Sequence, residues 1–148
     1  MKSYLLIFTA GLLLLVSPLM TKAPAAAEAE VKSRLSLCLT TDKTIYAPGE
    51  TIRMTLVVAN HTPDEVILRF RNAQRFDFLI DQERKPIWRW SKGRMFAQVL
   101  GEERLRPGES MTFFAKFDEK LQPGKYHITG MIVADPSPLT ASSNIVIR

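Results

Sequence analysis

Apolar and polar residues alternate along a series of short segments that runs through most of this chain. In the segment 51–59, for example, Ile52, Met54 and Leu56 fall on one face of an extended strand. Successive side chains of a strand point to opposite sides, so a period of two indicates strands with one buried face. The same alternation recurs at 65–71, 76–81, 111–117, 126–133 and 144–147. No window after residue 30 sustains the 3.6-residue period of a helix, and the chain is therefore predicted to be all β.

Pro-Gly pairs separate these strand patterns at three places, Pro48-Gly49, Pro107-Gly108 and Pro123-Gly124. Proline presets φ to about −65° and glycine supplies a positive φ, which is the combination that a type II turn requires. The clusters 60–64 and 91–94 are further turn signals. Roughly seven to nine strands, with a turn signal about every 8–12 residues, predict an antiparallel immunoglobulin-like β-sandwich. A small closed barrel is the alternative.

Residues 1–27 are typical of a secretory signal peptide. The apolar run 5–16 ends before it reaches the about 20 residues of a membrane span, and the small residues Ala25-Ala26-Ala27 suit a signal peptidase. We therefore expect cleavage near Ala27 and a mature single domain of residues 28–148, secreted or in the cell envelope, with no stable membrane insertion after cleavage. The alternative is an uncleaved N-terminal membrane anchor.

Cys38 is the only cysteine, so the chain has no internal disulfide. It alternates with the leucines of the segment 35–39, and we expect it to be a small buried residue rather than a reactive thiol. His61 and His127 lie far apart in the sequence, and the aspartates form no calcium-loop motif, so no metal and no cofactor is predicted. We expect a monomer.

No motif of a hydrolase, kinase or dinucleotide-binding enzyme occurs in the chain, and we predict that it is not an enzyme. Asp77 and Asp81 could share one face of a strand, with Cβ atoms about 13 Å apart by strand rise. That separation is wide for two catalytic carboxylates. We interpret both as solvated strand charges.

Positive charge is concentrated in residues 69–106, which hold 10 basic and 5 acidic residues. This distribution excludes a nucleic-acid-binding tail and permits a basic patch for an acidic protein partner. An exported protein rarely meets nucleic acid, and none is expected as a ligand.

The stretch 76–98 combines five aromatic residues with basic residues between them. Two interpretations stay open: all five aromatics lie in the core, or Trp90 and the turn 91–94 form an exposed contact. Trp88 and Trp90 share a strand face, so one is expected between the sheets and the other nearer a surface. Aromatic and arginine clusters are typical of interface hot spots. The predicted partner-binding residues are Arg89, Trp90, Ser91, Lys92, Gly93 and Arg94.

The order of residues through this stretch and beyond it resembles the BsuPI family of intracellular proteinase inhibitors. The matching residues are Phe76, Asp77, Phe78, Trp88, Trp90, Ser91, Gly93, Phe96, Gln98, Pro107, Gly108, Gly124, Tyr126 and Gly130. The resemblance spans roughly residues 50–134 and implies an immunoglobulin-like sandwich that inhibits a serine proteinase. The resemblance transfers no reactive-loop residue to this chain. The family is called intracellular, whereas the N-terminus of this chain predicts export.

These observations lead to the hypothesis of a secreted domain that blocks a subtilisin-like serine protease through its end loops. The candidate loops are 60–64, 91–94, 101–107 and 135–143. The alternative is a cell-envelope module that binds a protein without inhibiting it, because a fold does not fix a function.

The signal-peptide interpretation makes a direct prediction about the mature N-terminus. N-terminal sequencing of protein recovered from the medium or the cell envelope should begin at or near Glu28, because the alanines before it suit the peptidase. Recovery of the full-length chain from membranes alone would instead support the anchor.

Overall fold

The computed structural model describes residues 34–148, and these residues form ten strands. The strands are β1 (Leu35–Thr41), β2 (Ile45–Tyr46), β3 (Ile52–Asn60), β4 (Val66–Phe70), β5 (Phe76–Gln82), β6 (Lys85–Arg89), β7 (Gly101–Leu105), β8 (Ser110–Phe117), β9 (Gly124–Ile132) and β10 (Leu139–Ile147). No helix lies between residues 35 and 148, so the all-β prediction is confirmed. Within the described range, no helix has the length and apolar character that crossing a bilayer requires.

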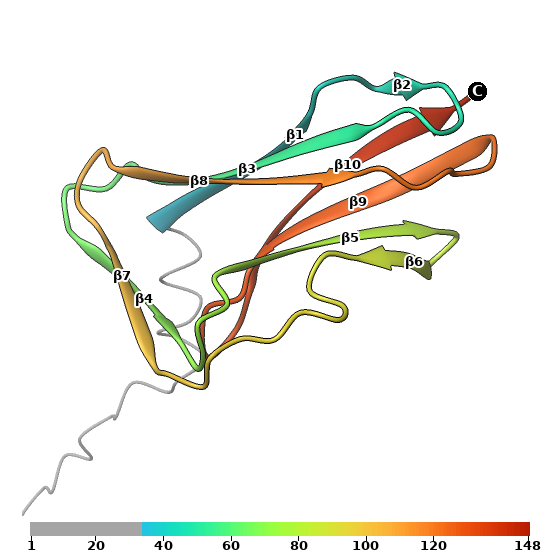
Figure 1. Ribbon diagram of the computed structural model, residues 1–148. Coiled ribbons are helices and arrows are strands. Elements are labelled where there is room, and N and C mark those ends of the chain that lie inside the picture. The colour runs from blue at the N-terminus through green and yellow to red at the C-terminus, as the bar shows by residue number, and fades with distance from the viewer. Residues whose placement is uncertain (1–33) are drawn as a thin grey trace, which may run out of the picture.

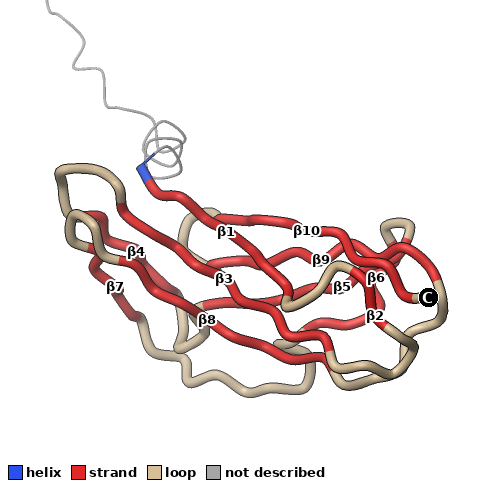
Figure 2. Tube along the Cα trace, turned by 90° about the horizontal axis from the view of Figure 1, so that it is seen from above, coloured by secondary structure: helices blue, strands red, loops and turns tan. Residues whose placement is uncertain are grey.

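Two sheets face one another and a third, smaller one closes one end (Figure 1). The upper layer has the order β1-β3-β8 and the lower layer β10-β9-β5-β6, with the short β2 added at the β10 edge, while β4 pairs with β7 alone. All pairs are antiparallel except β2 with β10. Seen from above, the strands of both layers run along one long axis (Figure 2). This arrangement is the predicted β-sandwich, with ten strands where we expected seven to nine.

The alternation in the sequence defines the core between the layers. Ile52, Met54 and Leu56 of β3 are buried, and Ile128 of β9 faces them from the lower sheet. At Gly130 the layers come so close that a Cβ atom would lie 2.7 Å from the Leu56 side chain. A larger residue at this position of β9 would force the buried Leu56 side chain to move.

Two of the three predicted type II turns form, at 47–50 and 106–109, whereas at the third Pro-Gly pair β9 already begins at Gly124. In each turn the N–H of the fourth residue donates to the C=O of the first, over 3.0 Å. Gly49 has a φ of +87° and Gly108 a φ of +78°, values that favour glycine. At the third Pro-Gly pair, the Tyr126 hydroxyl donates to the carbonyl of Gln122, 2.9 Å away, which is the tyrosine corner of immunoglobulin-like sandwiches.

Asn60 ties the small sheet to the sandwich. Its side chain is fully buried, and its amide nitrogen donates to the carbonyls of Asp64 (2.7 Å) and Leu105 (2.9 Å). Its amide oxygen accepts the N–H and the hydroxyl of Thr62, and its own N–H donates to the carbonyl of Glu109. The ends of β3 and β7 are thereby fixed to one another.

Three expectations about local structure were wrong. Cys38 is exposed, because the leucines of β1 face the core and the cysteine alternates with them. The segment 101–105 is strand β7 rather than a loop, although its charged residues hide the pattern and only Leu105 is fully buried. The segment 135–143 is a loop only up to residue 138, because β10 begins at Leu139.

A buried tyrosine joins the connection between β1 and β2 to β3. The Tyr46 hydroxyl donates to the Asp42 carboxylate (2.7 Å) and accepts the N–H of Lys43 (3.0 Å). The same carboxylate accepts the N–H of Arg53. Burial of the ring, followed by the hydrogen bond to Asp42, raises the pKa of Tyr46 from 10.0 to about 12.

This raised pKa predicts a loss of stability in alkali. The hydroxyl ionises at lower pH in the unfolded chain than in the folded one, so its contribution is complete below pH 10 and is lost between about pH 10 and 12. The free energy of unfolding should fall by an amount on the order of 2 kcal/mol across this range. Urea denaturation of wild type and Tyr46→Phe should show a shallower fall in the variant. Parallel curves would show that another group governs alkaline unfolding.

Candidate functional site

A buried carboxylate organises the segment that follows β6. Asp77 of β5 is fully buried, and its Oδ2 accepts hydrogen bonds from Nε of Arg89 (2.6 Å) and Oγ of Ser91 (2.6 Å). Its Oδ1 accepts the backbone N–H groups of Ser91 and Phe78, both at 3.0 Å. The interpretation of Asp77 as a solvated charge was wrong because Arg89 and Ser91 cover its face of the sheet. Asp81, farther along the strand, is only half-buried.

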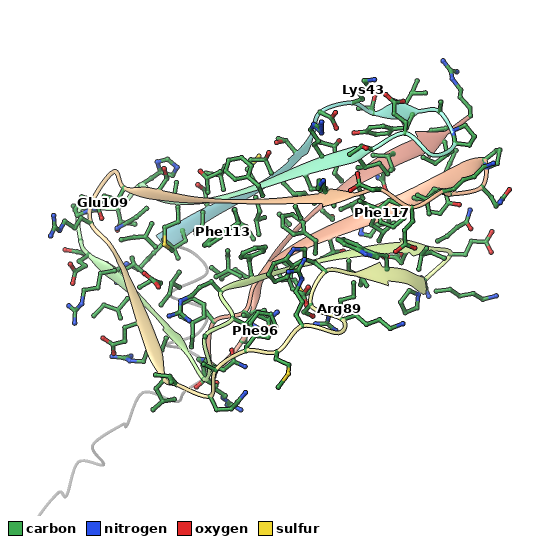
Figure 3. All side chains as sticks on the ribbon, in the orientation of Figure 1. Lys43, Arg89, Phe96, Glu109, Phe113 and Phe117 are labelled. Atoms are coloured by element: carbon green, nitrogen blue, oxygen red, sulfur yellow. The ribbon has the colours of Figure 1, made fainter. Side chains whose placement is uncertain are left out.

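Aromatic rings fill the space between the layers on the side where β6 and β8 are the edge strands. Phe113 and Phe117 extend from β8 toward the lower layer (Figure 3). The Trp90 ring lies 4.3 Å from that of Phe76, which in turn stacks on Phe113 at 4.8 Å. Trp88 meets Phe117 edge-on at 5.4 Å. Both tryptophans are half-buried and packed against the core.

The turn 91–94 projects beyond this cluster. The N–H of Arg94 donates to the carbonyl of Ser91 (3.0 Å), and Gly93 has a φ of +78° with no atom near its missing side chain. The Arg94 guanidinium lies 4.2 Å from the centre of the Trp90 ring, and its Nε donates to the carbonyl of Trp90 (2.8 Å). Lys92 is exposed.

The six predicted partner-binding residues therefore divide into two groups. Arg89 and Ser91 bind the buried Asp77 and Trp90 packs against the core, whereas Lys92, Gly93 and Arg94 are exposed and only Arg94 of these is held, by its contacts with Trp90. Partner binding by either group stays a prediction.

Ion pairs neutralise much of the positive charge in residues 69–106. Six of the 10 basic residues pair with carboxylates, some of which lie outside this stretch: Arg69, Arg71, Arg75, Arg89, Arg104 and Arg106. Among residues 34–148, Arg84, Lys85, Lys92 and Arg94 have no such partner. The positive surface is thus smaller than the sequence suggested, and it lies at the two ends of β6.

The sequence analysis missed an exposed apolar segment, residues 94–100, which leads from β6 to β7. Three of its residues are among the most exposed large apolar side chains: Met95 (98%), Leu100 (81%) and Val99 (64%). The segment follows the lower margin of the molecule up to the start of β7 (Figure 1). The sequence does hold a signal for this segment. Its apolar residues follow no alternating pattern, and they lie between the turn 91–94 and the charged residues of β7.

A depression of about 900 Å³ on the outer face of the lower sheet is a weaker candidate. It is lined in part by His127, whose Nδ1 lies 3.0 Å from Oδ1 of Asn144. No nucleophile with a base beside it lines this depression. Over the described part of the chain, no three His, Cys, Asp or Glu side chains are grouped so that they could hold a metal ion.

The geometry assigns structural roles to several residues of the family resemblance. Asp77 and Ser91 fix the segment after β6, Tyr126 forms the tyrosine corner, and Gly130 allows close packing. A family model described as "BsuPI: Intracellular proteinase inhibitor" matches residues 39–137, which is more than half of the chain. The chain belongs to the BsuPI family. The resemblance inferred from the sequence is thereby confirmed.

Solved structures are similar to this chain at low sequence identity. Spo0M, a sporulation control protein from Bacillus subtilis, is 14% identical with a TM-score of 0.51 over 78% of this chain and 49% of Spo0M. The CARDB domain of PF1109 from Pyrococcus furiosus is 12% identical with a TM-score of 0.47, over 77% of this chain and 94% of that domain. This chain thus spans about half the length of Spo0M. No curated protein sequence matches it.

Removal of the buried carboxylate should destabilise the domain. Asp77→Ala leaves the Ser91 N–H and hydroxyl without their acceptor, and we expect the free energy of unfolding to fall by about 3 kcal/mol. Asp81→Ala, on the same strand, is the matched control and should cost less than about 0.5 kcal/mol. Chemical denaturation of both variants measures the difference. An equal fall in the free energy of unfolding for both variants would show that the hydrogen bonds of Asp77 do not stabilise the domain.

Proposed function

We propose that this BsuPI-family protein is an exported inhibitor of a subtilisin-like serine protease. The observation that carries the proposal is the family match over residues 39–137. Export is inferred from the signal-peptide pattern of residues 1–27, which lie outside the described residues. The family is described as intracellular, so this member would act in a different compartment from the one that its family name implies.

A rigid exposed segment supports inhibition. A protease inhibitor must fill the substrate cleft, and a segment already fixed in its bound shape loses little conformational entropy on binding. Here the Asp77 network holds the turn 91–94, and Phe96 packs on Trp90 with ring centres 6.0 Å apart. The segment is therefore exposed without being loose.

We infer that the predicted partner-binding residues have two different roles in binding. Arg89, Trp90 and Ser91 would fix the shape of the turn. Lys92 and Arg94, which have no ion pair within residues 34–148, would attract an acidic protease surface. Exposed charges of this kind change mainly the rate of association.

A titration of the purified protein against a subtilisin-type protease tests the function. Activity should fall linearly to an end point at a fixed molar ratio of inhibitor to protease. Lys92→Ala should slow association several-fold at low ionic strength and have little effect at 0.5 M salt, since screening shortens the range of the charge. Lys116→Ala on β8 in the upper layer is the control and should behave as wild type.

A failure to slow any serine protease would contradict the inhibitor proposal. Binding of the protein to another envelope protein, with proteases left fully active, would favour the non-inhibitory module.

A further inference from the structure

The last two residues before β7 are both apolar and both exposed. Leu100 is 81% exposed and Val99 64%, and neither belongs to a strand. One exposed leucine on a protein surface needs no explanation. Several exposed apolar side chains on a single segment are typical of an interaction site.

The backbone around Leu100 has an extended course. No turn or bend interrupts residues 94–100, and β7 follows directly from Gly101. Every residue from 94 to 105 has a negative φ. Proteins often recognise peptide segments as extended strands, with pockets for individual side chains. Residues 97–103 therefore already have a course that a substrate cleft can accept.

Both flanks of Leu100 are fixed to the domain. On the amino side, the carbonyl of Ala97 accepts the N–H of Ala73 over 2.9 Å. On the carboxyl side, the pairing of β7 with β4 begins at once, with Gly101 opposite Phe70. The segment is therefore attached on both sides of the Leu100–Gly101 peptide, and its two halves would stay close together in a protease complex.

Arg75 supports this peptide from behind. Its Nε donates to the Glu103 carboxylate (2.8 Å), its Nη1 donates to the carbonyl of Asn72 (2.8 Å), and its guanidinium lies 4.5 Å from the centre of the Phe70 ring. A Cβ atom at Gly101 would collide with this guanidinium. The guanidinium thus fills the place of a side chain directly after Leu100.

Other exposed residues of the segment fit a substrate cleft less well. Met95 is 98% exposed, but Gly93, two residues before it, has a φ of +78° and belongs to a turn. The backbone before Met95 is therefore not extended. The Arg94 side chain is held against Trp90. Val99 and Leu100 both have extended chain on either side, and Leu100 is the more exposed of the two, at 81% against 64%.

We propose that residues 97–103 occupy the substrate cleft of the target protease, with the Leu100 side chain in the pocket that selects the residue before the scissile bond. This inference rests on the proposed inhibitor function and names the contact that would perform it. It also specifies the target class, because an aliphatic side chain requires an apolar pocket of the chymotrypsin or subtilisin kind. A trypsin-like pocket, with a carboxylate at its base, would exclude it.

A charge introduced at Leu100 tests the inference through a change of specificity. Leu100→Lys should weaken inhibition of an apolar-pocket protease by roughly 30-fold or more, the effect of losing a hot spot of about 2 kcal/mol. It should at the same time inhibit trypsin, whereas we expect wild type to leave trypsin active. Met95→Lys is the matched control, because it places the same charge at an exposed apolar residue of the same segment. Its inhibition constants should stay within about threefold of wild type.

Thermal unfolding of both variants checks the fold. Both should have the melting temperature of wild type, since neither side chain is buried. If Leu100→Lys inhibits the apolar-pocket protease as well as wild type does, the contact lies elsewhere and this inference is wrong, while the proposed function stands. A switch to trypsin in Met95→Lys instead of Leu100→Lys would also overturn it. If wild type inhibits no protease of either class, the proposed function fails and this inference fails with it.

Discussion

The carboxylate of Asp77 is the constraint on which much of this structure depends. A buried carboxylate without partners would cost several kcal/mol, so the chain must bring donors to it. Arg89 and Ser91 supply these donors from 12 and 14 residues along the chain. Their position fixes where β6 ends and where the next turn begins. The aromatic cluster around Trp90 is placed by the same bonds, because Trp90 lies between the two donors.

Arg75 fixes the opposite end of the exposed segment, because it links the approach to β5 with β7 through Glu103. Asn60 joins the end of β3 to the far end of β7, at Leu105. The segment 94–100 is thus stretched between two anchored regions, with Ala97 bonded at its middle. Anchoring at several points explains how a segment without regular structure can present apolar side chains to solvent in one shape.

The residues that carry the family resemblance serve mainly to build this scaffold. Asp77, Ser91, Tyr126 and Gly130 all have partners or close neighbours inside the domain. Leu100, which we propose as the specificity residue, is not among the residues of the resemblance. This separation is physically reasonable, because a scaffold is constrained by its own packing, whereas a contact residue is constrained by its partner.

Local sequence pattern determined the all-β class of this protein. The period of two identified six of the ten strands and the buried face of β3, and the Pro-Gly pairs predicted the turns at 47–50 and 106–109. These features depend on neighbours within a few residues, so the sequence expresses them directly.

The tertiary structure decided which outward-facing residues are covered and by what. Asp77 and Cys38 both alternate with core residues, yet Asp77 is buried and Cys38 is exposed. The difference arises because Arg89 and Ser91 fold back over Asp77, whereas no segment of residues 34–148 covers Cys38. The same reason applies to the basic residues of 69–106, whose ion pairs join segments far apart in the chain. Contacts between distant segments leave no periodic signal in the sequence, so only the fold shows which of these side chains are covered.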